Sequence, residues 1–256
     1  MTLSLPIEDG ANELLTRSPL ALLTAMLLDQ QVPLEKAFSS PDELAQRLGH
    51  EPTAEELAGY DPDALAAVFS ERPALHRFPK AMAARVQELG RLIVERYDGD
   101  ASQVWATAAT GTELASRLAE LPGFGAYKAQ ITMALLGKQL GVRPEGWREA
   151  AGRFGEEGSH YSVADITDGA SLAAVREHKK QLKAAAKAKA SRHQATEPWP
   201  GTAPVVLAPP GSAVSLPFST LPSTNHLPNV KLPPAGLQPT SGWTPVGPRD
   251  TTEQPG

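Results

Sequence analysis

Residues 121–130 read LPGFGAYKAQ, and they place two glycines, a tyrosine and a lysine at the expected start of a helix. Gly123 and Gly125 permit backbone angles and close approaches that a Cβ atom would prevent. The first amides of the following helix lack partners inside it, so this hairpin can bind an oxyanion, most commonly a phosphate. The alternative is a simple turn with a glycine cap. Lys128 adds the question whether its amine is placed to act as a nucleophile.

The elements that must position this hairpin begin with recognisable helix starts. Ser18-Pro19 is an N-cap followed by a proline in the first turn, and the apolar stretch behind it indicates a buried central helix. Ser40-Pro41 with two following acids, Thr53 with Glu56, and Asp61-Pro62 repeat this pattern. Each of these sites is predicted to start a helix.

Helical periodicity continues through the middle of the chain. Apolar residues recur at helical spacing over 78–96, and the segments 101–108, 112–121 and 126–140 add three more expected helices. No alternating strand pattern of useful length occurs in this part. The sequence therefore predicts an all-α fold of eight or nine short helices.

The composition changes after residue 190. Residues 191–256 hold 14 of the 24 prolines without helical periodicity, so they are predicted to be a disordered Pro-rich tail. Residues 1–190 form the expected folded domain, which ends in a basic helix over about 171–190. Cysteine is absent, which excludes disulfides, cysteine-bound zinc and an iron–sulfur cluster.

The distribution of charge along the chain indicates which kinds of partner the protein can bind. Residues 1–175 carry 15 basic and 25 acidic side chains, whereas residues 176–190 carry six basic side chains against Glu177 alone. The basic helix could follow phosphates, lie against the acidic body of the protein, or only add solubility. The N-terminus lacks a basic region followed by a long apolar stretch, and no apolar run could cross a bilayer, so we expect a cytoplasmic protein with no membrane partner.

Three segments together resemble a known family. LPGFGAYKAQITMALLG resembles the helix-hairpin-helix of the HhH-GPD superfamily, the endonuclease III, adenine glycosylase and alkyladenine glycosylase relatives that excise damaged bases from DNA. SPLALLTAMLLDQQVPLEKAF resembles the early helix of that superfamily, and RFPKAMAARVQELGRLIVERY resembles a later one. Their order and spacing are those of the family, and the resemblance covers about residues 15–155.

The resemblance implies a two-lobed helical protein with double-stranded DNA across its cleft. The hairpin at Leu121, Gly123, Phe124 and Gly125 would bind a backbone phosphate, with a monovalent cation on the carbonyls of Leu121 and Gly123. The partner would be a duplex with a damaged or mismatched base, bound by a nucleoid-associated monomer that needs no other cofactor.

A glutamine would stand beside the flipped base. Gln31, with Gln30 as the near alternative, occupies the position from which relatives insert a side chain into the space left by that base. A polar helix end is the other interpretation of this pair.

Basic side chains near the hairpin would add to the phosphate contacts. Amide donors are neutral, so a protein with a net charge of −5 can still bind DNA through them and a few basic side chains. Arg91, Lys128 and Lys138 are the local candidates, and each could instead be a solvated surface charge.

The family position of the lysine that forms a Schiff base lies two residues past the second hairpin glycine, and here it is Tyr127. Lys128 is one residue further on, which turns it about 100° around the helix. The resemblance therefore implies a monofunctional glycosylase and not a lyase. Tyr127 is either a base-pocket residue or a half-buried helix residue.

The family's catalytic aspartate is expected after the second hairpin helix, where GVRPEGWREAAGRFG contains none. Glu145 stands at the matching spacing after Pro144, and Glu149 is the second choice; the alternative for Glu145 is a first-turn acid in a new helix. Trp147 is either a pocket wall or part of the core. The resemblance implies hydrolysis of the N-glycosidic bond of a flipped damaged base, and the alternative is a protein of this fold that binds lesions without cutting.

Overall fold

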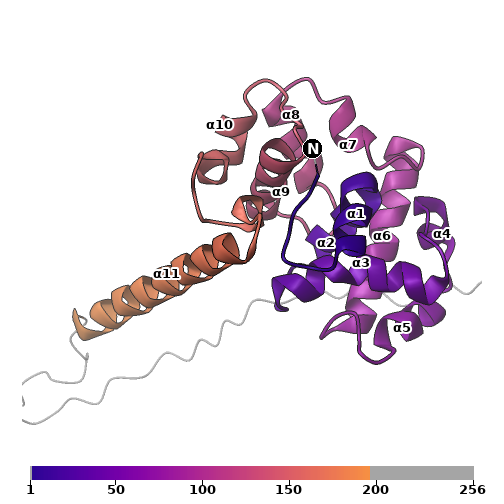
Figure 1. Ribbon diagram of the computed structural model, residues 1–256, viewed down its shortest axis with the longest axis horizontal. Helices are drawn as coiled ribbons and strands as arrows, with labels where there is room; N and C mark the ends of the chain where they lie inside the picture. Colours follow the sequence, from indigo (N-terminus) through magenta and orange to yellow (C-terminus); the bar gives the residue numbers. More distant parts are fainter. Residues whose placement is uncertain (1, 197–256) are drawn as a thin grey trace, which may run out of the picture. The chain divides into compact units, whose positions relative to one another are not determined.

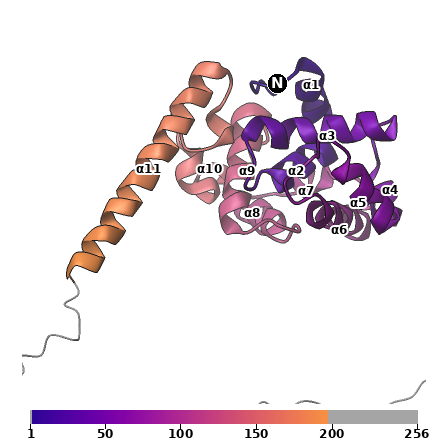
Figure 2. The same ribbon diagram turned by 90° about the horizontal axis from the view of Figure 1, so that it is seen from below.

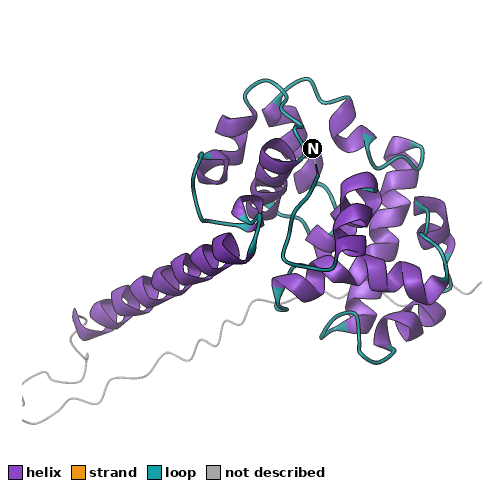
Figure 3. Cartoon of the chain, viewed as in Figure 1, coloured by secondary structure: helices purple, strands orange, loops and turns teal. Residues whose placement is uncertain are grey.

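The computed structural model describes residues 2–196, which form helices joined by loops (Figures 1 and 3). Within these residues the backbone forms no strand, apart from one isolated bridge between Thr110 and Glu145. The all-α prediction is confirmed. The helices are α1 (Asp9–Arg17), α2 (Pro19–Leu28), α3 (Leu34–Leu48), α4 (Ala54–Gly59), α5 (Pro62–Ser70), α6 (Pro79–Tyr97), α7 (Gln103–Ala106), α8 (Gly111–Ala119), α9 (Ala126–Gln139), α10 (Trp147–Ala151) and α11 (Gly169–Thr196), with 3-10 turns at Gly152–Gly155 and Val163–Asp165.

The helices pack in two groups, with α1 to α6 in one and α7 to α10 in the other (Figure 1). In the first group α6 packs against α2, α4 and α5, and α3 packs against α1 and α2. In the second group α9 packs against α8, α10 and both 3-10 turns. Helix α11 contacts the second 3-10 turn near its start and extends away from both groups, as two perpendicular views show (Figures 1 and 2).

Helix α2 is the apolar centre of the first group. Its residues from Ala21 to Leu28 are all buried, because the sequence is apolar on every side of the helix. The Ser18 hydroxyl accepts a hydrogen bond from the Ala21 amide at 3.3 Å, and Pro19 occupies the first turn. The predicted start of this helix is confirmed.

Two of the three other predicted helix starts are also found. Thr53 accepts from the Glu56 amide at 3.2 Å and Asp61 accepts from the Ala64 amide at 2.8 Å, so both cap helices as expected. The prediction of a helix start at Ser40-Pro41 is wrong, because α3 begins at Leu34 and runs through Pro41. The Ser40 hydroxyl donates to the Lys36 carbonyl at 2.6 Å inside this helix, so serine and proline do not mark a terminus here.

Helix α11 is longer than predicted, because it continues to Thr196 and so includes the first six residues of the expected tail. The rest of that tail, residues 197–256, lies outside the described residues. Among the residues that are described, no helix combines the length and the apolar character needed to cross a membrane.

Candidate functional site

The hairpin between α8 and α9 is anchored by two buried apolar side chains. Leu121 and Phe124 are 2% and 7% exposed, and the Phe124 amide donates to the Leu121 carbonyl at 2.9 Å, which closes the turn. Gly123 has φ of +74°, a conformation that side chains with a Cβ adopt rarely. This glycine is required by the turn itself.

Gly125 has a different explanation. Its φ is −117°, and an added Cβ would meet nothing within 4 Å, so neither strain nor packing demands a glycine here. It is the N-cap of α9 but supplies no side chain to cap the helix, and the amides of Gly125, Ala126 and Tyr127 donate to no acceptor among residues 2–196. The start of α9 therefore offers free donors and room for a ligand.

The two glutamines behind the hairpin lie in different environments. The Gln30 side chain donates to the Leu27 carbonyl at 2.7 Å and accepts from Arg85 at 3.0 Å, and its amide nitrogen lies beside Gly123. Gln31 is exposed and has φ of +59°, a strained conformation for a residue with a side chain. Gln30 is thus held inside the protein, whereas Gln31 is free to contact a partner.

Lys128 is committed to the protein. Its Nζ donates to the carbonyls of Met26 at 2.5 Å, Leu27 at 3.1 Å and Asp29 at 3.5 Å, so it satisfies the last carbonyls of α2. Burial lowers the pKa of Lys128 to about 8, although the nearby Asp29 charge opposes this shift. The amine holds the two helix groups together and is not free to attack a sugar.

Tyr127 begins a row of aromatic side chains next to the hairpin. It is 59% exposed, its hydroxyl accepts from Arg153 at 3.3 Å, and its ring meets Phe154 edge to face at 5.1 Å. Tyr161 continues the row beyond Phe154, and the Arg153 guanidinium lies within 6 Å of all three rings. Arg153 and Phe154 were not singled out from the sequence, because their approach to Tyr127 depends on how the chain returns after α10.

Glu145 and Trp147 lie at the other end of α9. The Glu145 carbonyl accepts from the Gly111 amide at 2.7 Å at the start of α8, and the Trp147 ring packs on Gly137 in the last turns of α9. Gly137 is ten residues from Tyr127, about 15 Å along the helix. The structure therefore does not bring Glu145 and Trp147 together with Tyr127. The second-choice acid, Glu149, lies exposed on α10 with Trp147.

A second exposed segment adjoins the glutamines. The buried His76 ring bonds the Gln30 carbonyl through Nε2 at 2.9 Å, and two residues later Phe78 is 42% exposed with Arg77 over its ring. One signal in the sequence could have found it, an aromatic residue directly before the helix start at Pro79. The bond of His76 to the Gln30 carbonyl places this segment next to the glutamines.

The basic residues expected near the hairpin have other partners. Lys138 donates to Asp165 and to the Glu156 carbonyl, both at 2.5 Å. Arg91 is exposed and donates to the Ala58 carbonyl of α4 at 3.4 Å. Arg85 donates to Gln30 at 3.0 Å, and its Cδ would lie 3.8 Å from a Cβ at Gly123, so this basic side chain adjoins the hairpin although it was not predicted.

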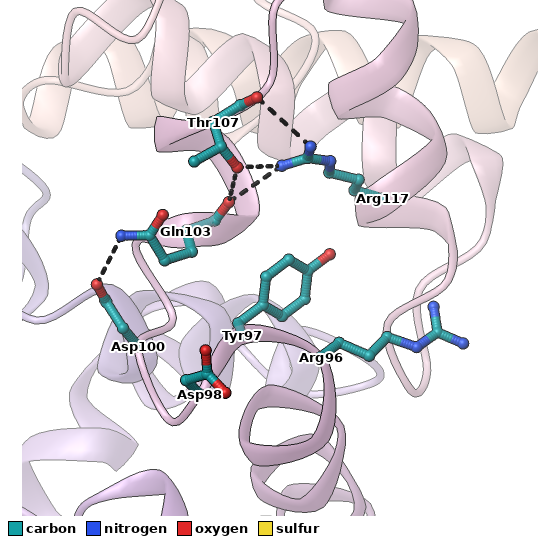
Figure 4. A pocket seen from close by; sticks show the side chains of 7 residues that line it. All are labelled: Arg96, Tyr97, Asp98, Asp100, Gln103, Thr107 and Arg117. Atoms are coloured by element: carbon teal, nitrogen blue, oxygen red, sulfur yellow. Dashed lines mark hydrogen bonds between the residues drawn. The ribbon is translucent and has the colours of Figure 1, made fainter.

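A cavity of about 620 Å³ lies at the C-terminal end of α6, beside α7 and α8 (Figure 4). Arg117 donates to the carbonyls of Gln103 and Thr107 there, and Asp100 accepts from Gln103, so these groups close α7. Phe78, which borders the glutamine loop, precedes the opposite end of the 19-residue α6, about 28 Å away. None of the residues that line this cavity belongs to the hairpin at 121–125, and its polar groups are used by the fold.

Comparison with known proteins agrees with this arrangement. A family model described as HhH-GPD superfamily base excision DNA repair protein matches residues 24–200, which is more than half of the chain. A search of curated proteins found no match. The matched region contains both glutamines, the hairpin and the whole of α9, with α11 at its end. The chain belongs to the HhH-GPD superfamily of base excision DNA repair proteins.

Proposed function

We propose that the protein is a monofunctional DNA glycosylase that hydrolyses the N-glycosidic bond of a damaged base flipped out of a duplex. The observation that carries this proposal is the open start of α9, where free amides and an unhindered Gly125 adjoin the exposed Tyr127. A DNA phosphate fits these neutral donors. The family to which the chain belongs acts on DNA, which makes phosphate the ligand of choice.

The residues around the hairpin have complementary roles in this proposal. Gln31 enters the space left by the flipped base, and Phe78 lies on the adjoining loop where it can stack on a neighbouring base. Tyr127 and Arg153 form the exposed edge of the base pocket. A monovalent cation would bind the carbonyls of Leu121 and Gly123; the Leu121 oxygen keeps one lone pair after accepting from Phe124.

Helix α11 would add electrostatic attraction to the duplex. Arg176, Lys180, Lys183 and Lys187 are spaced by four, three and four residues, which aligns them on one side of the helix. Arg176 bonds Glu35 of α3 at 2.7 Å, so this basic stripe starts against the first helix group. From Lys179 to residue 188 the helix is exposed on every side, and the stripe remains accessible to DNA phosphates.

Lyase activity is not part of the proposal. Tyr127 cannot form a Schiff base, and Lys128 donates to three backbone carbonyls. We therefore expect base release that leaves an intact abasic strand, which breaks only on treatment with alkali.

The second candidate function is lesion binding without cleavage. It is favoured by the position of Glu145, the predicted catalytic residue, whose backbone carbonyl accepts from the Gly111 amide at the start of α8, away from the Tyr127 end of α9. If Glu145 is the sole candidate for the catalytic carboxylate, the proposed pocket beside Tyr127 contains no such carboxylate.

The direct test is a screen of the purified protein against duplexes with uracil, alkylated purines, oxidised bases or mismatches. We expect strand scission of one substrate class only after alkali. Scission without alkali would refute the monofunctional assignment. Selective binding of a lesion with no scission in any duplex would support the second candidate function.

A further inference from the structure

Asp29 is the acidic side chain whose position the fold does not explain. It directly follows α2, and its backbone amide donates to the Ala25 carbonyl while its backbone carbonyl accepts from Lys128. The carboxylate itself makes no hydrogen bond and no ion pair within 4 Å in the described part of the chain. A negative charge at the C-terminal end of a helix is unfavourable, because the helix dipole is negative there. The helix dipole therefore does not explain an aspartate at this position.

The residues around Asp29 also adjoin the hairpin. Lys128, whose Nζ is 3.5 Å from the Asp29 carbonyl, is three residues past Gly125 and adjoins Tyr127. The next residue, Gln30, lies beside Gly123, and Gln31 follows it. Asp29 thus connects the proposed wedge to the start of α9, where a flipped nucleotide would enter.

Two lysines from different helices act on this carboxylate through their charge. Burial raises the pKa of Asp29, and Lys128 of α9 and Lys179 of α11 counteract that shift by their charge. Neither lysine bonds the carboxylate, and Lys128 has three carbonyl partners of its own. The residue is half-buried, and its carboxylate is partly desolvated. Such a group is suited to interact with a cation that forms during a reaction.

We propose that Asp29 is the catalytic carboxylate of this protein; this proposal rests on the proposed glycosylase function. As the N-glycosidic bond breaks, the bonding pair leaves with the base and positive charge develops on the sugar at C1′. The Asp29 carboxylate stabilises this charge. A water molecule then adds to C1′ and gives one proton to Asp29, which passes it to solvent, while the released base takes up a proton from solvent.

Two variants and two readouts test this assignment. The variants are Asp29→Asn, which removes the charge and keeps the shape, and the matched control Glu145→Gln at the other end of α9. The first readout is excision of the base class that the wild-type protein releases. Asp29→Asn should slow excision by at least about 100-fold with duplex binding retained, whereas Glu145→Gln should stay within about threefold. Equal excision by wild type and Asp29→Asn would overturn the proposal.

The second readout needs no turnover and separates this proposal from the glycosylase assignment. Binding is compared for two duplexes, one with a neutral tetrahydrofuran abasic residue and one with a cationic pyrrolidine in its place. The wild type and Glu145→Gln should prefer the cationic duplex by about tenfold or more, and Asp29→Asn should lose that preference. A wild type that binds both equally would overturn the role of Asp29, even if excision is found. Thermal unfolding of each variant establishes that it is folded.

Discussion

The two ends of α9 differ in how completely packing and hydrogen bonds within the protein account for their residues. At the C-terminal end Trp147 packs on Gly137, the Arg143 side chain donates to the Gly137 carbonyl at 2.8 Å, and the Glu145 backbone bonds Gly111. At the N-terminal end the first amides find no acceptor within residues 2–196, Gly125 has open space, and Tyr127 is exposed. Packing explains the residues at the C-terminal end, whereas it does not explain those at the N-terminal end.

The closed end is most directly disturbed at Gly137. A Cβ there would lie 2.4 Å from two carbons of the Trp147 ring, so the indole must move. We expect Gly137→Ala to lower the free energy of unfolding by about 2–3 kcal/mol, as overpacking does in other cores. Urea denaturation measures it, with Gly59→Ala as the control because its Cβ meets nothing within 4 Å. Equal stability of the two variants would mean that the Trp147 contact is not tight.

The open end responds in the opposite way to substitution. In Gly125→Asp the carboxylate can cap the free amides of α9, as Asp61 caps α5, which should raise stability by about 0.3 kcal/mol, since glycine is itself a tolerated N-cap. The same carboxylate would occupy the phosphate site and repel DNA, so duplex affinity should fall at least about tenfold. Binding and unfolding are measured on the same preparation. A variant that gains stability and keeps its affinity would refute a phosphate site at the hairpin.

The closed, C-terminal end of α9 was predicted from the sequence less well than the open, N-terminal end. Local signals such as Ser18, Thr53 and Asp61 act within one helical turn, and they predicted helix starts correctly. The hairpin was equally visible, because its two glycines lie beside the helix that they open. Pro41 misled the prediction, since a proline within a helix is tolerated when the surrounding packing compensates for it.

Long-range contacts could not be read from spacing. Glu145 was assigned by counting residues from the hairpin, but a bond to Gly111, 34 positions earlier, determines where its loop lies. The return of Arg153 and Phe154 to Tyr127 depends on the path of α10 in the same way. Asp29 was adjacent to a predicted glutamine, yet its burial and its lysine neighbours come from three separate helices.

The basic stripe on α11 is a second candidate contact with DNA, outside α9. Lys180→Gln combined with Lys183→Gln should weaken duplex binding and make the negative slope of log affinity against log salt shallower by about 1.8, if each lysine neutralises one phosphate. The matched control is Arg17→Gln with Arg96→Gln, which removes two charges that pair with Glu51 and Glu120. Equal slopes for the two double variants would show that α11 does not contact the duplex.

Lys128 provides a smaller, pH-dependent test of the open end. Its pKa is about 8 in the folded protein, below its ordinary value of 10.5, so between these values the unfolded chain retains a proton that the folded protein releases. Stability attributable to this residue therefore rises with pH across that window. The stability of the wild type minus that of Lys128→Met should increase from pH 8 to pH 10. A constant difference would contradict the burial of this amine.

The central claim is that DNA binds the open end of α9 and not the closed end. Nuclear magnetic resonance of the ¹⁵N-labelled protein during titration with an abasic duplex tests it directly, because backbone amides report from both ends at once. We predict shifts concentrated at Gly123, Gly125 and Ala126, with the Trp147 indole and the amides of Glu145 and Gly146 nearly unchanged. Shifts centred on 143–147 with an unperturbed hairpin would contradict the account.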